Sequence, residues 1–243
     1  MHKRPAMRLL QRVRWRDVRV GRWRCPCCRW PIHLRLEERD VGVRCSRCRA
    51  SAITQSLVDV LLVRFGSPVG KDCLELSGRG ALVAWLARRA GQLTRTEYMP
   101  DLPGGHMVDG VRNEDVQAMT FAPDHFDLCT CTEVFEHVVD DMAGFREVLR
   151  VLRPGGAFVF TVPLTGAART VERARMVDGR VRHELEPEYH GDPYSGSGHV
   201  LCFRNYGNDI VDRLREAGFG EAAIVRPRSR MFGFARGVVF ARK

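Results

Sequence analysis

Strand-like and helical segments alternate through the last two thirds of the chain, and this alternation most constrains the fold. Short apolar runs at 72–77, 92–98, 126–132 and 157–163 have the composition of buried strands, and 82–91, 140–152 and 206–219 have helical spacing. A further strand ends near residue 116, and strand-like runs 222–227 and 237–243 close the chain. This order predicts an α/β fold, a parallel sheet with helices on both faces that binds ligands at the carboxyl ends of its strands.

The same order resembles a known family over roughly residues 70–243. The stretches that carry the resemblance are "FDLCTCTEVFEHV" (126–138) and "LRVLRPGGAFVFTVP" (149–163), with the "RPGG" turn as the most specific match. They are similar to the class I, Rossmann-like S-adenosylmethionine-dependent methyltransferases, in particular the type 11-like group. The resemblance implies a methyltransferase domain over 69–243. It also implies a seven-stranded sheet with an antiparallel last strand, and S-adenosylmethionine bound across the first three strands.

The glycine turn after the first strand departs from the family's pattern. In "CLELSGRGAL" (73–82), Glu75 fits the acid that ends this strand, but strict register places Ser77, Arg79 and Ala81 at the glycine positions. A loop shortened by one residue restores the match and puts Gly78 and Gly80 on the second and third glycines. Glycine lets the backbone approach a cofactor because it has no Cβ. We therefore expect Glu75, Gly78 and Gly80 to be cofactor-binding residues.

Two later acids fit the same interpretation. Glu97 ends the next strand 22 positions after Glu75, one fewer than the family's commonest spacing, so the same missing residue explains both departures. By the resemblance, Glu97 would bind the ribose hydroxyls. In "DVQAMTF" (115–121), Asp115 would bind the adenine amino group and Val116 would lie against the adenine face.

The chemistry is expected in "EVFEHV", after the fourth strand. Glu133, Glu136 and His137 stand at i, i+3 and i+4, one face of a helical turn. In one interpretation His137 is the general base and the glutamates orient it or the substrate. In another, the three residues and His199 bind Mg²⁺ or another divalent cation, as "ExxEH" does in the quinone-type and small-RNA 2′-O-methyltransferases that it resembles. In a third interpretation, the glutamates only cap or solvate the start of a helix and His137 has only a packing role.

The polar insert 165–203 lies between the fifth strand and the last helix, where this fold usually places a substrate lid. It contains His183 and His190, which are alternative metal ligands or substrate contacts. No "NPPY" or "DPPY" follows the fourth strand, which argues against methylation of an exocyclic base amine.

Two CxxC pairs precede the α/β segment. Cys25/Cys28 and Cys45/Cys48 are separated by 16 residues, a spacing that predicts a structural four-cysteine zinc ribbon. Cys27 is a spare that could replace a neighbour, and the later cysteines, Cys73, Cys129, Cys131 and Cys202, fit packing positions better than ligand positions. We expect a ribbon within residues 1–50, then a linker helix within 51–68.

The chain's positive charge is concentrated in residues 1–50, which contain 15 Lys and Arg against 4 Asp and Glu. Such a segment suits RNA, DNA or an acidic membrane surface, although a solvated tail would have the same composition. No apolar run is long enough to span a membrane, which favours a cytoplasmic protein. The leading hypothesis is O-methylation of a small molecule, sugar or lipid-linked acceptor. The alternatives are an RNA methyltransferase guided by the ribbon, and a non-catalytic binding module on a degenerate methyltransferase scaffold.

Overall fold

A mixed β-sheet forms the centre of the protein in a computed structural model that describes residues 19–36, 40–191 and 198–243. The basic residues before position 19 and part of the expected lid, 192–197, lie outside the described residues. The strands lie in the order β16 (Glu221–Val225), β17 (Val238–Arg242), β9 (Leu152–Thr161), β8 (Phe126–Thr132), β4 (Asp72–Glu75), β5 (Gln92–Glu97), β7 (Val111–Asn113) and β6 (Met107–Val108).

The expectation of seven strands was wrong by one, because this sheet has eight among the described residues. The additional strand is β6, two residues long, which pairs antiparallel with β7 at the sheet edge. The last strand, β17, is antiparallel to both β9 and β16, as expected. β4, β5, β7, β8 and β9 pair in parallel, so their carboxyl ends share one edge of the sheet. The expected "RPGG" turn lies inside β9, opposite a register shift in β8, with Gly155 at a φ of 77°.

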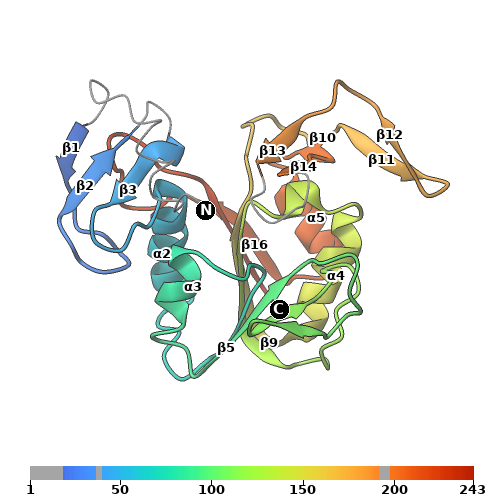
Figure 1. The fold of residues 1–243 in the computed structure, drawn as a ribbon, viewed down its shortest axis with the longest axis horizontal. Helices are drawn as coiled ribbons and strands as arrows, with labels where there is room; N and C mark the ends of the chain where they lie inside the picture. The colour runs from blue at the N-terminus through green and yellow to red at the C-terminus, as the bar shows by residue number, and fades with distance from the viewer. Residues whose placement is uncertain (1–18, 37–39, 192–197) are drawn as a thin grey trace, which may run out of the picture.

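Helices cover both faces of the sheet (Figure 1). α2 (Ala52–Arg64) and α3 (Ala81–Leu86) lie on one face, and α4 (Asp141–Val151) and α5 (Ile210–Glu216) lie on the other. Short polar side chains cap the starts of α2 and α4. Ser51 Oγ accepts a hydrogen bond from the amide of Thr54 (3.1 Å), and Asp140 Oδ1 accepts one from the amide of Ala143 (3.0 Å).

The N-terminal module is a three-stranded antiparallel sheet of β1 (Arg19–Arg22), β2 (Ile32–Arg35) and β3 (Val43–Cys45), with the 3₁₀ turn η2 (Asp40–Gly42) before β3. Its Cys25, Cys45 and Ala50 belong to the same buried cluster as Leu57 of α2 and Trp85 of α3. The module and the helices on this face of the central sheet therefore share one hydrophobic core.

The insert after β9 folds into short antiparallel pairs. β10 (Val171–Glu172) pairs with β15 (Arg204–Asn205), β11 (Ala174–Val177) with β12 (Arg180–His183), and β13 (Tyr189–Gly191) with β14 (His199–Leu201). Figure 1 shows β13 and β14 beside the top of the α4–α5 layer, and the β11–β12 hairpin extending away from the body. Among the helices in the described part of the chain, none is long and apolar enough to cross a membrane.

Candidate active site

A cavity of about 590 Å³ opens at the carboxyl edge of the parallel strands. Its wall combines Ser77 and Arg79 from the glycine loop, Glu97 from the end of β5, and the segment after β7. The segment after β8 and the insert complete it, with Glu133, His137 and His190 among the lining residues. The parallel topology explains this meeting, since loops that follow parallel strands emerge at the same edge.

Of the predicted cofactor-binding residues, Glu97, Asp115 and Val116 line this cavity. Glu97 Oε2 accepts a hydrogen bond from the amide of Gly78 (3.1 Å), which ties the glycine loop to the end of β5. Asp115 Oδ1 accepts hydrogen bonds from the amide (2.9 Å) and the side-chain Nε2 (3.0 Å) of Gln117. These contacts fix two carboxylates on the wall of one cavity.

The two glycines have different steric reasons to be glycine. A Cβ on Gly78 would stand 3.1 Å from a methyl of Val111 and 3.4 Å from Glu97 Oε2. Gly80 has a φ of 124°, a conformation that other residues rarely adopt, and it is the residue before α3 begins. Neither glycine lines the cavity itself, although the neighbouring Ser77 and Arg79 do.

Glu75 lies behind the cavity wall, fully buried. Its carboxylate accepts hydrogen bonds from the hydroxyl of Ser77 (2.6 Å), a residue that lines the cavity, and from the hydroxyl of Thr130 on β8. Burial raises the pKa of Glu75 to about 7, against the hydrogen bonds that lower it. Sequence reasoning missed Thr130 as a partner because cross-strand pairs are set by register, and it missed Ser77, two residues along the chain, because it treated that residue only as a replaced glycine.

The raised pKa of Glu75 predicts that the free energy of unfolding falls as the pH rises. The unfolded pKa is about 4.5 and the folded one about 7, so the native state binds more protons between these values. The stabilising contribution is complete below pH 4.5 and lost as the pH rises through 7. The Glu75→Gln side chain cannot ionise, so its stability does not fall in this way. We expect the free energy of unfolding of the variant minus that of wild type to increase by about 3 kcal/mol from pH 4.5 to pH 8. Urea unfolding of both proteins measures this, and a difference that does not change with pH would contradict it.

The "EVFEHV" segment forms a short turn and not the helical turn assumed from its spacing. Glu133 has a positive φ of 54°, and only Phe135–His137 (η3) is helical, in a 3₁₀ turn. Glu133 and His137 line the cavity, and Glu136 is 1% exposed with neither carboxylate oxygen hydrogen-bonded among the described residues. Burial and the neighbouring Glu136 raise the pKa of Glu133 to about 7.

Two histidine rings face the buried Glu136 carboxylate. Glu136 Oε1 lies 3.6 Å from His137 Nε2 and 3.7 Å from His190 Nδ1. The other nitrogen of each ring faces an oxygen: His137 Nδ1 is 2.9 Å from the carbonyl of Leu201, and His190 Nε2 is 3.4 Å from Glu188 Oε1. His190, which sequence analysis named only as an alternative, therefore belongs to the centre of the site.

His199 does not join this group. It is exposed on β14, where its backbone pairs with Gly191. In this cavity region, the described side chains whose metal-ligating atoms lie within 4.8 Å of one another are His137, His190 and Cys202. Cys202 Sγ is 3.8 Å from His137 Nδ1, and burial raises the pKa of its thiol to about 12, so it stays protonated.

Arg204 was not predicted, and it fixes the turn that carries Glu136 and His137. The side chain is 3% exposed, and its guanidinium donates to the carbonyls of Phe135 (3.1 Å), Val138 (2.5 Å) and Val139 (2.7 Å). No motif signals an arginine 67 positions after the turn that it binds.

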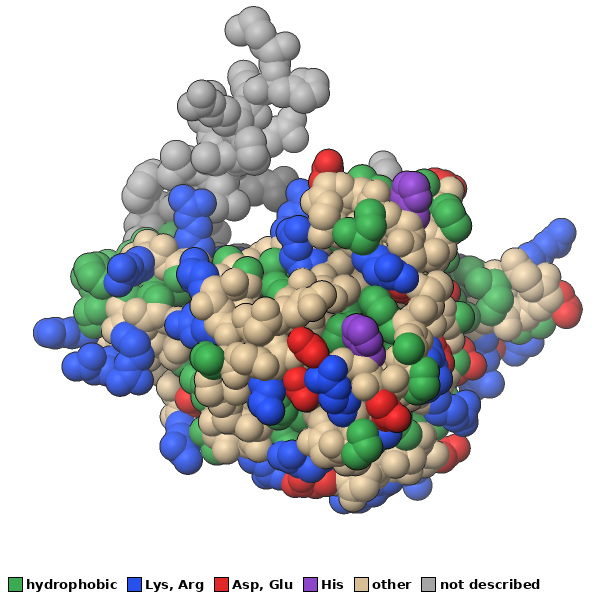
Figure 2. Space-filling model, turned by 90° about the horizontal axis from the view of Figure 1, so that it is seen from below, with side chains coloured by type: hydrophobic (Ala, Val, Ile, Leu, Met, Phe, Trp, Pro, Cys, Tyr) green, Lys and Arg blue, Asp and Glu red, His purple; other side chains and the backbone are tan. Residues whose placement is uncertain are grey.

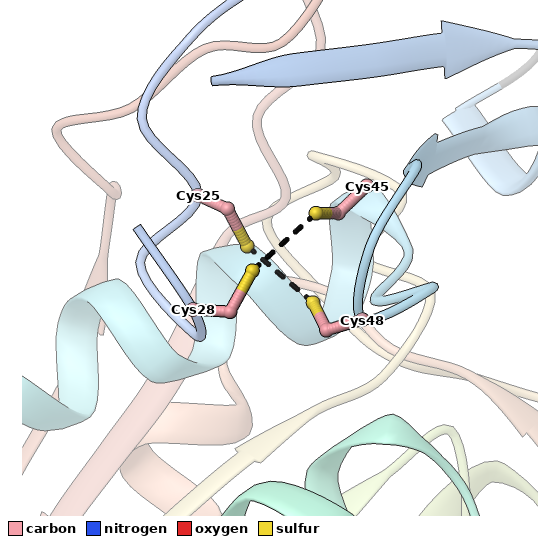
Figure 3. Close-up of side chains that lie close together, drawn as sticks. All are labelled: Cys25, Cys28, Cys45 and Cys48. Atoms are coloured by element: carbon pink, nitrogen blue, oxygen red, sulfur yellow. Dashed lines mark hydrogen bonds between the residues drawn. The ribbon is translucent and has the colours of Figure 1, made fainter. Parts of the chain in front are cut away.

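The four predicted zinc ligands come together from the two knuckles (Figure 3). Cys25 Sγ lies 3.6 Å from Cys48 Sγ, and Cys28 Sγ lies 3.6 Å from Cys45 Sγ. Four sulfurs at these separations fit the corners of a tetrahedron around one zinc ion. Cys27 is not a member of the group, although its hydrogen bonding lowers the pKa of Cys25 to about 3 and of Cys48 to about 6.

Comparison with known proteins agrees with this fold. Residues 74–160 match the family described as "Methyltransferase domain". A ubiquinone biosynthesis O-methyltransferase of Aeromonas salmonicida is 31% identical over 116 residues, which are 43% of this chain and 49% of the relative. Its counterpart in Yersinia pestis is 31% identical over 114 residues, 43% and 47% of the two chains. The chain thus spans about half the length of the curated relatives it matches.

A solved structure extends the likeness to most of the fold. An S-adenosylmethionine-dependent methyltransferase from Mesorhizobium loti superposes with a TM-score of 0.50 at 19% identity, covering 77% of this chain and 98% of that one. The likeness shows that the chain has the α/β fold of this class of structure, and residues 74–160 are the part that matches the methyltransferase-domain family.

Proposed function

We propose that this protein transfers a methyl group from S-adenosylmethionine to an oxygen atom of a small molecule, sugar or lipid-linked acceptor. One observation carries the proposal: a single cavity joins Glu97 and Asp115, the expected cofactor carboxylates, to Glu133, His137 and His190. The similarity to ubiquinone biosynthesis O-methyltransferases over 43% of this chain favours oxygen as the acceptor atom.

The described residues fit the cofactor. Glu97 would accept hydrogen bonds from the ribose hydroxyls, Asp115 from the adenine amino group, and Val116 would pack on the adenine face. Gly78 and Gly80 would let the loop backbone approach, and Glu75 would act through Ser77 because it does not reach the cavity itself. Bound there, S-adenosylmethionine would supply an electrophilic methyl group on its sulfonium.

His137 is the base that we assign to the reaction. Its Nδ1 donates to the carbonyl of Leu201, which leaves Nε2 of the neutral ring free to accept a proton. As the acceptor oxygen bonds to the methyl carbon and the carbon–sulfur bond breaks, the hydroxyl proton would pass to Nε2 and S-adenosylhomocysteine would leave. The buried Glu136 carboxylate, 3.6 Å from Nε2, would stabilise the imidazolium.

His137→Asn is expected to slow turnover about 10²- to 10⁴-fold while cofactor affinity stays within twofold, because His137 handles the proton and not the cofactor. Transfer of labelled methyl from S-adenosylmethionine to a panel of catechols and polyprenyl phenols measures the first quantity, and binding of S-adenosylhomocysteine the second. His106→Asn, outside the cavity lining, is the matched control. Full turnover in His137→Asn would remove His137 from this role.

As an alternative to His137 acting as the base, we propose that the site binds a divalent cation, with a ligand set that differs from the predicted Glu133, Glu136, His137 and His199. Nε2 of His137 would then be a metal ligand and would not accept the proton. The group best placed is Glu136 Oε1, His137 Nε2 and His190 Nδ1. Separations of 3.6 and 3.7 Å are too long for hydrogen bonds, and they approach the distance between two atoms bound to one ion at about 2.1 Å. Metal-binding histidines commonly direct the other ring nitrogen to a carbonyl or carboxylate, as both do here. Mg²⁺ or another divalent cation there would hold the acceptor hydroxyl and lower its pKa.

Manganese binding tests this ligand set. Zinc-loaded wild type is expected to bind one Mn²⁺ by electron paramagnetic resonance, and His190→Ala to bind it at least tenfold more weakly. His183→Ala, on the exposed strand β12, is the matched control and should bind as wild type does. Equal Mn²⁺ affinity in wild type and His190→Ala would exclude His190 as a ligand, and absence of Mn²⁺ binding to wild type would leave His137 as a metal-free base.

For the N-terminal module we propose a structural zinc ribbon. Its four thiols would be the whole coordination shell, so the ion would contribute folding energy and have no open position for catalysis.

A further inference from the structure

A second cavity lies between the zinc module and helix α3. It has a volume of about 570 Å³, and its lining is Cys27, Cys28, Arg47, Cys48, Ala84, Arg88 and Arg89. Three of these seven side chains are arginines, from two segments that the fold brings together, and none is acidic. We call this cavity the arginine groove.

The arginines of the groove are not neutralised by carboxylates. Within the described residues, Arg47 and Arg88 are exposed and make no ion pair, and Arg89 donates only to the carbonyls of Trp85 (3.2 Å) and Cys27 (3.3 Å). On the other helix layer, by comparison, Arg150 pairs with Glu147 and Arg213 pairs with Asp141. The groove therefore holds positive charge that no carboxylate of the described residues balances.

Zinc does not remove this charge. A zinc ion with four thiolates carries a net charge of −2. The described part of the module, 19–36 and 40–50, contains eight arginines and one aspartate. Its net charge thus stays positive after zinc is counted, and Arg88 and Arg89 add to it. Figure 2 shows the same bias, with Lys and Arg side chains along the left edge, the side where Figure 1 places β1–β3 and α3.

An exposed aromatic ring stands beside the groove. Trp30 is 38% exposed, its ring is 5.7 Å from the guanidinium of Arg47, and its Nε1 donates to Ser46 Oγ (2.8 Å), which fixes the ring. A fixed indole next to a guanidinium offers a surface on which an unpaired base can stack, while neighbouring cations bind the phosphates. The carboxylates of an acidic peptide would pair with the arginines but would not stack on the indole.

We propose that the arginine groove binds single-stranded nucleic acid, with phosphates on Arg47, Arg88 and Arg89 and one base on Trp30. The site is separate from the methyltransferase cavity, and the inference does not rest on the proposed reaction. Occupancy of the groove would direct the protein to a nucleic acid whether or not that nucleic acid is the methyl acceptor.

The test uses the full zinc-loaded chain and fluorescein-labelled 12-mers of single-stranded RNA and DNA in fluorescence anisotropy. Affinity is expected to fall with salt. The double variant Arg47→Glu/Arg88→Glu should bind at least tenfold more weakly and reduce the slope of log affinity against log salt by about 1 to 1.5. Trp30→Ala should weaken binding about tenfold with an unchanged slope. Arg146→Glu, exposed on α4 in the other helix layer, should bind as wild type does.

The outcomes separate the possibilities. Preference for RNA over DNA assigns RNA, and equal affinity assigns single strands of either kind. Either outcome supports nucleic-acid binding by the groove if the double variant binds the oligonucleotides more weakly. Its zinc content, melting temperature and S-adenosylhomocysteine binding must be those of wild type. Wild-type affinity in the double variant, or binding of polyglutamate as tight as that of the oligonucleotides, would overturn the proposal.

Discussion

Loss of zinc from the four-cysteine cluster is expected to lower the melting temperature of the whole protein by at least about 6–12 °C. Structural zinc contributes about 10–16 kcal/mol in isolated zinc fingers, and a loss of only about 3 kcal/mol would shift a domain of this size by that amount. The effect should reach the methyltransferase domain because Cys25 and Cys45 share a buried cluster with Leu57 and Trp85. Calorimetry with and without a zinc chelator measures the shift.

Cys48→Ser is expected to reproduce the effect of the chelator, since removal of one ligand opens the tetrahedron. Cys27→Ser is the matched control: Cys27 is buried in the same knuckle but lies outside the group of four, so this variant should retain one zinc per chain. A melting temperature that stays within about 2 °C of wild type after zinc is removed would show that the module does not depend on the ion.

Glu97→Ala is expected to weaken binding of S-adenosylhomocysteine by about 10²-fold. The carboxylate would accept two hydrogen bonds from the ribose, and hydrogen bonds to a charged group contribute about 1.5–3 kcal/mol each. The same change removes the acceptor of the Gly78 amide, so the glycine loop also loses its contact with the end of β5. Calorimetric titration measures the affinity.

Glu97→Gln and Glu216→Ala are informative controls for this effect. The side-chain amide oxygen that Glu97→Gln introduces can still accept from the Gly78 amide, so only the ribose contacts should weaken. The affinity of this variant should therefore lie between those of wild type and Glu97→Ala. Glu216 is exposed at the end of α5, and its loss should leave affinity unchanged. Wild-type affinity in Glu97→Ala would place the ribose elsewhere.

The order of strands and helices was predictable because each element has its own local spacing of apolar residues. The strand expected at 126–132 has the same bounds as β8, and the helix expected at 140–152 corresponds to α4 (Asp141–Val151). The eighth strand was missed because β6 is two residues long and forms only through its pairing with β7. The helix expected at 82–91 ends at Leu86, before Arg88 and Arg89, which face the arginine groove.

The candidate site was predictable where motifs are local and not where side chains meet across the fold. The four cysteines follow from their spacing, and Glu97 and Asp115 follow from the family resemblance; the structure brings the cysteines together and places both carboxylates on one cavity wall. The prediction of His199 in place of His190 relied on position before the last helix, whereas the β13–β14 register decides which histidine faces Glu136. The contact of Arg204 with the turn at Phe135–His137 likewise depends on tertiary packing alone.

Calorimetric titration of the zinc-loaded wild-type protein with S-adenosylhomocysteine, beside Asp115→Ala, tests the central claim most directly. We expect saturable binding of one ligand per chain to wild type and at least tenfold weaker binding to the variant, since Asp115 lines the cavity. Absence of heat together with an unchanged melting temperature at high ligand concentration would contradict the proposal. The protein would then be a binding module on a methyltransferase fold, with the arginine groove as its remaining functional site.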